Sequence, residues 1–249
     1  MFPILQLGPL AMQLPGLFLL AGVWISTWLM ERVAPKHRVS AGSLSNMVFL
    51  GLIAGILGAR LWYAIRYFNV YLEAPLSLLA LNPSTLAPVE GILTGFLVAW
   101  IYGQRKELPL WPTLDALAIP FAMMSIAIGF AHLSSGDAFG AASEIPWAIE
   151  LWGTRRHPTQ IYEILLGGVV FIALWRWRRV KLPPGILFFA WGALAAASRL
   201  FLEAFRGDSV IVLEAFRSAQ ILSLLALLGS MWGMHRLSVR NEEPIREKS

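Results

Sequence analysis

The sequence predicts an all-α fold, a polytopic membrane helix bundle of about seven transmembrane helices. Of its 249 residues, 57% are hydrophobic and only 14% are charged, and the mean hydropathy is +0.63. A soluble domain carries about 25% charged residues, because its surface must be hydrated. The charges here stand in short clusters between long apolar runs. This composition excludes a disordered chain, and the lack of cysteine excludes a disulfide scaffold, a cysteine zinc site and a cysteine nucleophile.

Seven segments approach the roughly 20 apolar residues that a spanning helix needs. They cover residues 10–30, 45–68, 88–103, 112–133, 160–177, 184–204 and 219–236. The third is short and begins with Pro88 and Glu90. Residues 1–237 are expected to form a single transmembrane domain, followed by a polar, frayed tail over 238–249. The first residues lack a basic region and a small-residue cleavage site, so no removable signal peptide is expected.

Lysine and arginine predict the orientation, because they accumulate in cytoplasmic loops. Thirteen of the 20 basic residues lie after the first, third and fifth segments or in the tail. The N-terminus is therefore expected outside and the C-terminus in the cytoplasm, and the pI of ≈ 9.9 reflects topology and anionic lipid rather than nucleic acid. The other seven lie within spans or toward the outer side: Arg60, Arg66, Arg155, Arg156, Arg199, Arg206 and Arg217. Charges inside a membrane are costly, so these arginines are the ones expected to carry function.

Two outer-face loops are expected, over residues 69–87 and 134–158. The first is apolar but interrupted by proline, and is either an amphipathic helix in the headgroup layer or a loop packed over the bundle. The second contains a glycine-rich turn with Asp137 and leads into the motif HPTQIYE, where Pro158 suits the first turn of a helix. Glu163, in the same motif, is costly in an apolar helix unless it is paired.

The sixth span ends in RLFLEAFR, where Arg199, Glu203 and Arg206 at i, i+4 and i+7 are expected to share one helical face. One interpretation is that Arg199 and Glu203 neutralise each other inside the bundle. The second arginine leaves excess positive charge, which suits an anionic ligand better. The tetrapeptide EAFR recurs at 214–217, a repeat interpreted as coincidence.

The second span carries GARLWYAIRY, with Arg60, Tyr63 and Arg66 in its outer half. Arg66 is able to extend to the interface, whereas Arg60 is deeper and is the better candidate for a buried role. The charged and polar residues of the second, fifth and sixth spans are expected to converge near the outer leaflet. A cationic, partly dry cavity open to lipid would bind a phospholipid headgroup.

These motifs resemble the bacterial prolipoprotein diacylglyceryl transferase family. The similarity covers most of the chain, through GARLWY, HPTQIYE, RLFLEAFR and AQILSLL, and HPTQIYE is close to the family's H-P-S-Q-L-Y-E. The resemblance implies a seven-span enzyme of the bacterial inner membrane that moves a diacylglyceryl group from phosphatidylglycerol to the lipobox cysteine of a prolipoprotein. The thiol attacks the glyceryl carbon, and glycerol phosphate departs while positive groups stabilise its charge. The implied partners are this phospholipid, the prolipoprotein signal peptide and the membrane; no nucleic acid, cofactor or metal is expected.

The resemblance implies that Arg199 matches an essential arginine of the family and that Glu203 and Arg206 match its companions. It also matches His157, Gln160, Tyr162 and Glu163 to the family's loop–helix motif, while the remaining site residues follow from their own positions in the chain. The expected catalytic residues are Arg199, His132 and Glu90. The expected substrate-binding residues are Arg60, Tyr63, Asp137, His157, Gln160, Tyr162, Glu163, Glu203 and Arg206.

The chain departs from the family signature at several positions, which include Ser135 at the second asparagine, Asp137 at the glutamate and Ala141 at the final arginine. The family signature R-I-G-N-F-x-N-G-E-x-x-G-R is here GFAHLSSGDAFGA, so that Gly129 stands at the essential arginine and His132 at the first asparagine. The family's H-G-G in the third span aligns with Glu90, Gly91 and Ile92, and a carboxylate replaces the histidine base. The family's two central arginines are expected to clamp the phosphate of the lipid. Loss of one clamp arginine weakens phosphate binding by about 1.5–3 kcal/mol per charged hydrogen bond. Loss of a general base lowers the reaction rate by about 10²–10⁴.

His132 and Glu90 are the expected substitutes. His132 lies about one helical turn beyond Gly129 and would act as base or phosphate donor; the alternative is a hydrogen-bonded interior histidine. Glu90 would abstract the proton; the alternative is a charge favoured at a helix N-terminus by the macrodipole.

The family activity is the first functional hypothesis. The second, favoured by the changes at Gly129 and Glu90, is a homologue without this chemistry that acts as a phospholipid-binding subunit or accessory protein of a membrane complex. A channel or transporter fits less well, because the charges gather at one side instead of the midplane.

Overall fold

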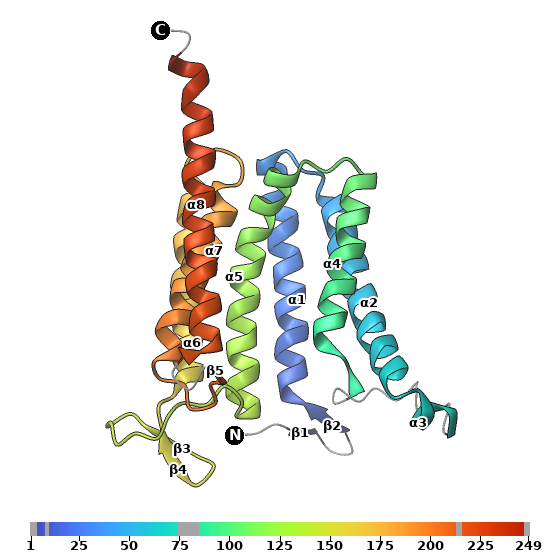
Figure 1. The fold of residues 1–249 in the computed structure, drawn as a ribbon, viewed down its shortest axis with the longest axis vertical. Coiled ribbons are helices and arrows are strands. Elements are labelled where there is room, and N and C mark those ends of the chain that lie inside the picture. Colours follow the sequence, from blue (N-terminus) through green and yellow to red (C-terminus); the bar gives the residue numbers. More distant parts are fainter. Residues whose placement is uncertain (1–3, 8–9, 74–84, 213–215, 247–249) are drawn as a thin grey trace. The chain divides into compact units, whose positions relative to one another are not determined.

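The computed structural model describes residues 4–7, 10–73, 85–212 and 216–246, and it confirms the all-α prediction. Within these ranges, each of the seven predicted segments contains one long helix (Figure 1). These helices are α1 (Leu14–Val33), α2 (Ala41–Arg66), α4 (Pro88–Arg105), α5 (Leu110–Ser135), α6 (Thr159–Trp177), α7 (Ile186–Glu203) and α8 (Ser218–Arg246).

The short elements were not predicted. They are a 3₁₀ helix (Ala34–His37), α3 (Phe68–Glu73) and three antiparallel pairs, β1–β2 (Ile4–Leu7, Leu10–Gln13), β3–β4 (Ile149–Leu151, Thr154–Arg156) and β5–β6 (Ile211–Val212, Phe216–Arg217). The first span was expected to begin near residue 10; α1 begins at Leu14, because residues 10–13 pair with β1. Pro15 lies in the first turn of α1, where its missing N–H costs nothing.

Five helices of the described chain, α1, α2, α5, α6 and α7, are long and apolar enough to cross a membrane. Large apolar side chains such as Leu20, Phe96 and Leu165 are more than half exposed, as lipid-facing residues are. The chain is therefore a multi-pass membrane protein. The count of seven spans and the sidedness of the two termini stay predictions.

The ends of two predicted regions differ from expectation. The tail expected to be frayed from residue 238 is helical through Arg246, as part of α8 (red in Figure 1). Of the outer-face loop 69–87, α3 covers the start, and residues 74–84 lie outside the described part of the chain.

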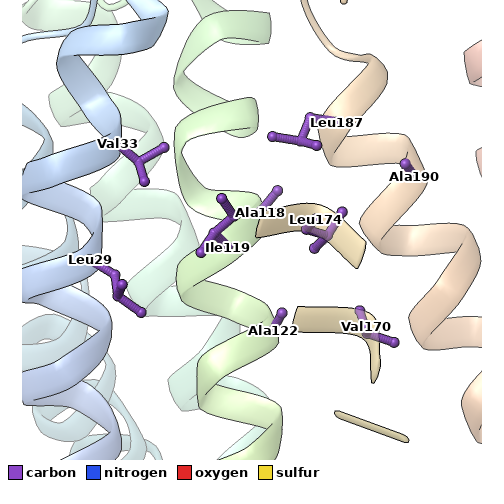
Figure 2. Packing of buried hydrophobic residues seen from close by; sticks show 9 residues of the cluster. All are labelled: Leu29, Val33, Ala118, Ile119, Ala122, Val170, Leu174, Leu187 and Ala190. Carbon is purple, nitrogen blue, oxygen red and sulfur yellow. The ribbon is translucent and has the colours of Figure 1, made fainter. Parts of the chain in front are cut away.

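The chain forms two compact units, one of residues 1–33 and 114–249 and the other of residues 34–113. The core of the first unit joins α1, α5, α6 and α7. Its fully buried members include Ile119, Leu174 and Leu187, with Leu29 and Val33 of α1 directed toward α5 (Figure 2).

A buried carboxylate caps α7 in the first unit. Asp115 of α5 is 3% exposed, and its Oδ2 and Oδ1 accept the backbone N–H groups of Gly185 at 2.7 Å and Phe188 at 2.8 Å. The residue at the N-cap itself, Gly185, has no side chain to do this. Asp115 therefore satisfies two donors that every helix start leaves unpaired.

In the second unit, α2 and α4 pack backbone against backbone through glycines. A Cβ added at Gly95 would lie 2.6 Å from the carbonyl oxygen of Gly51, and one at Gly91 would lie 2.8 Å from that of Gly55. Small residues at a helix interface allow this close approach, which supplies van der Waals packing where no hydrophobic effect drives association.

We expect Gly95→Leu to destabilise the second unit by about 1–3 kcal/mol or more, because the obstructing atoms belong to the backbone and cannot rotate away. The measurement is the free energy of unfolding of purified protein in detergent. Gly42→Leu is the matched control, since a Cβ at Gly42 meets nothing within 4 Å. Equal stability of the two variants would contradict the prediction.

Candidate functional site

His132 and Glu163 form a histidine–carboxylate pair between α5 and α6. Nδ1 of His132 lies 2.8 Å from Oε2 of Glu163, and the two side chains are 31% and 19% exposed. Glu163 thereby has the partner that an apolar helix requires of it. Since a neutral imidazole that donates from Nδ1 keeps a lone pair on Nε2, this geometry suits a proton acceptor. It also suits a hydrogen-bonded interior histidine, so the catalytic role stays a prediction.

Gly129, which the motif resemblance aligns with an essential arginine of the family, lies at a close contact between α5 and α6. A Cβ added there would lie 2.8 Å from Cγ1 and 3.2 Å from the backbone N of Ile164. The space that a larger side chain would need at Gly129 is therefore occupied by Ile164 of the neighbouring helix.

The start of α6 is tied to the loop that follows α5. Gln160 is fully buried and donates from Nε2 to the carbonyl oxygen of Asp137 at 2.9 Å, and Thr159 donates to that of Ala138 at 2.6 Å. Asp137 is engaged through its backbone, and the residue is exposed. Gln160 therefore holds the loop, and any contact that Gln160 or Asp137 makes with substrate stays a prediction.

Three rings join the start of α6 to the end of α7. The ring centroids of His157 and Phe205 are 5.2 Å apart, and Tyr162 lies 5.8 Å from Phe205 and 6.3 Å from His157. Trp147 donates from Nε1 to the Tyr162 hydroxyl at 2.7 Å. The buried Nδ1 of His157 has no hydrogen-bond partner among the described residues.

Arg199, Glu203 and Arg206 of the sixth span do not lie on one helix. Nη2 of Arg199 lies 3.5 Å from Oε2 of Glu203, which is fully buried. The expectation that Arg206 shares their helical face is wrong, because α7 ends at Glu203. In the turn that follows, Arg206 donates from Nε and Nη2 to the carboxylate of Asp208, at 2.8 and 2.6 Å.

Glu203 is left with little compensation for its burial. Neither of its carboxylate oxygens has a hydrogen-bond partner within the described ranges, and its contact with Arg199 is long. A buried charge is stable only when it is paired and hydrogen-bonded. The ion pair therefore contributes little to the stability of the fold. Arg199 is 38% exposed and remains available to an anionic ligand.

In the second unit, the predicted site residues Glu90 and Arg60 bind other groups of the same unit. Glu90, in the first turn of α4, forms an ion pair with Arg66. Arg60 donates to the carbonyl oxygen of Thr85 at 2.9 Å and lies over the ring of Tyr71. These contacts hold the segment before α4, and a role of Arg60 in binding substrate stays a prediction.

Tyr63 packs against Tyr67, the residue that follows α2, with ring centroids 4.6 Å apart. Its role in binding substrate also stays a prediction. The expected convergence of the second span with the fifth and sixth stays a prediction as well.

Two further arginines, which the sequence marks as basic residues against the positive-inside trend without assigning a role, lie near the end of α7 in the first unit. Arg156 and Arg217 line a cavity together with Arg206. The available signal was their position against the positive-inside trend, which does not say what they face. Among the described residues, no three His, Asp or Glu side chains are grouped so as to hold a metal ion.

Comparison with known proteins agrees with the motifs. A family model described as prolipoprotein diacylglyceryl transferase matches residues 3–236. The similar curated proteins are named phosphatidylglycerol–prolipoprotein diacylglyceryl transferase: one from Gloeobacter violaceus is 30% identical, covering 97% of this chain and 95% of its own. One from Thermosynechococcus vestitus is 28% identical, covering 94% and 91%, and one from Clostridioides difficile is 24% identical, covering 94% of each. The resemblance inferred from the motifs is confirmed, and the chain belongs to the prolipoprotein diacylglyceryl transferase family.

Proposed function

We propose that this protein transfers a diacylglyceryl group from phosphatidylglycerol to the lipobox cysteine of a prolipoprotein, at the outer face of a bacterial inner membrane. The observation that carries the proposal is similarity to enzymes named for this reaction over more than nine-tenths of both chains. In the reaction, a bond forms between the cysteine sulfur and a glyceryl carbon, the bond from that carbon to the phosphate oxygen breaks, and glycerol phosphate leaves. The thiol proton must pass to a base.

His132 is the base that the geometry favours. Its Nδ1 is held by Glu163, and Nε2 makes no hydrogen bond within the described ranges, so a proton can be accepted there. Glu163 is a positioning residue in this scheme, fixing the tautomer and the ring orientation. Arg199 supplies positive charge where negative charge develops on the leaving phosphate.

Glu90 is the second candidate base, and its carboxylate is bound by Arg66. Proton abstraction would first require Arg66 to release it. Because Arg66 occupies its carboxylate, we do not expect Glu90 to be the working base. Glu90→Gln should then lower the transfer rate by less than about tenfold, whereas loss of a working general base lowers it by about 10²–10⁴. Rates of peptide lipidation at saturating phosphatidylglycerol test this, with Glu150→Gln, at the exposed middle position of β3, as control. A loss of more than a hundredfold in Glu90→Gln alone would make Glu90 the base.

The replacement of the clamp arginine by Gly129 favours one other function, that of a phospholipid-binding subunit of a membrane complex. A single experiment separates the two. Purified protein is incubated with phosphatidylglycerol and a fluorescent lipobox peptide, and released glycerol phosphate and the mass of the peptide are measured. We expect both products from the wild type and neither from Arg199→Ala, with Arg155→Gln as a control that retains activity. Binding of phosphatidylglycerol without either product would reject the transferase and leave the subunit.

A further inference from the structure

An open cavity of ≈ 350 Å³ lies beside the end of α7 in the first unit. Its lining comes from three stretches of the outer segments and from β5–β6. The lining residues are Ala141, Ala142, Arg156, Arg206, Gly207, Ser209, Ile211 and Arg217.

The cavity has a backbone frame that holds it open. The N–H of Ala141 donates to the carbonyl oxygen of Phe205 at 2.8 Å, and that of Gly207 donates to Phe139 at 2.9 Å. Gly140 lies between these bonds, and a Cβ there would be 2.2 Å from a backbone carbonyl oxygen. Only glycine fits this close approach. The lining side chains therefore project from fixed positions.

The cavity carries excess positive charge. Arg156 donates from Nε and Nη1 to two backbone carbonyl oxygens, at 3.2 and 3.3 Å, and Arg217 donates from Nη1 to the carbonyl oxygens of Glu203 and Arg206. Neither guanidinium has a carboxylate partner within the described ranges. Asp208 neutralises Arg206 alone.

A structural role is available for Arg217, since its carbonyl partners lie at the C-terminal end of α7, where cations are favoured. That role uses one of its nitrogens, and a guanidinium has five N–H donors in a planar fork. Ser209, also in the lining, has a buried Oγ without a hydrogen-bond partner in the described chain. Arg206 and Arg217, the arginines of the two EAFR sequences, thus line the same cavity as the Ser209 hydroxyl.

We propose that this cavity binds a phosphate group, held by the guanidinium forks of Arg156 and Arg217 and by the Ser209 hydroxyl. Planar forks match phosphate oxygens in pairs, which is why arginine is preferred for such anions. The source of the phosphate rests on the proposed function: it is the glycerol phosphate that leaves, or the headgroup of the phosphatidylglycerol that enters.

The test is calorimetric titration of the full-length protein in phosphatidylcholine nanodiscs, without acceptor peptide. Glycerol phosphate is one titrant, and short-chain phosphatidylglycerol is the other. We expect Arg156→Gln and Arg217→Gln each to weaken binding at least about tenfold. Ser209→Ala should weaken it a few-fold. Arg155→Gln is the matched control, because Arg155 is exposed and lies outside the cavity lining, and it should bind as the wild type does.

Loss confined to glycerol phosphate identifies a product site, and loss confined to phosphatidylglycerol identifies a headgroup site; both support the proposal. Equal binding by wild type, Arg156→Gln and Arg217→Gln, or no binding of either titrant, overturns it. If Arg217→Gln fails to fold, Arg217→Lys and Arg156→Gln decide the question. Since no acceptor is present, arginine-dependent binding by a protein that lipidates no peptide would refute the transferase and retain this site.

Discussion

Replacing His132 with alanine is expected to lower the rate of peptide lipidation by about 10²–10⁴, the usual contribution of a positioned general base. The expectation follows from its 2.8 Å contact with Glu163, which orients the ring and leaves Nε2 for the thiol proton. The fall should appear in kcat, with little change in the KM for phosphatidylglycerol. Steady-state kinetics in detergent micelles with a lipobox peptide measure both.

Alanine at position 132 also leaves Glu163 without its partner, so thermal stability must be measured beside the rate. Glu163→Gln supplies the comparison: it keeps a hydrogen-bond acceptor for Nδ1 and should lose less activity than His132→Ala. If His132→Ala folds and retains more than a tenth of the activity, His132 is an interior histidine and not the base.

Asp115→Ala is expected to lower the free energy of unfolding by about 2–5 kcal/mol, since it removes a cap and leaves the buried N–H of Gly185 and the half-buried N–H of Phe188 unpaired. Both carboxylate oxygens are used, at 2.7 and 2.8 Å, and the α7 start has no cap of its own. Unfolding in detergent, followed by circular dichroism, measures the loss.

The free energy of unfolding of Asp115→Asn should lie between those of the wild type and Asp115→Ala, because asparagine retains one acceptor oxygen. Ser125→Ala, on the same helix, is the control, since its hydroxyl donates only to a carbonyl one turn away. A change below about 0.5 kcal/mol in Asp115→Ala, the range of ordinary surface substitutions, would mean that water replaces the cap.

The positions of the long helices could be predicted because a bilayer leaves the backbone few options. An apolar stretch must satisfy its own N–H and C=O groups, and a helix does so within one segment. The β1–β2 pair was missed for the complementary reason, since residues 10–13 form their hydrogen bonds with another strand. The helical tail through Arg246 was missed because apolar length alone does not mark where a helix ends.

The family could be predicted from HPTQIYE and RLFLEAFR, which carry their information in local spacing. The candidate site could be predicted only as a set of residues. Because α7 ends at Glu203, Arg206 lies outside the helix and pairs with Asp208. Helical periodicity in the sequence does not predict where the helix ends.

The amino-acid sequence by itself determined a helical membrane chain, its family and the residues in excess of the positive-inside pattern. Tertiary structure decided which side chains meet: His132 pairs with Glu163, and Arg156 and Arg217 line one cavity. The physical reason is that periodicity specifies directions within one helix, whereas a pair between segments depends on how two helices approach. That approach is decided by contacts such as those of Gly129 with Ile164, which involve atoms far apart in the chain.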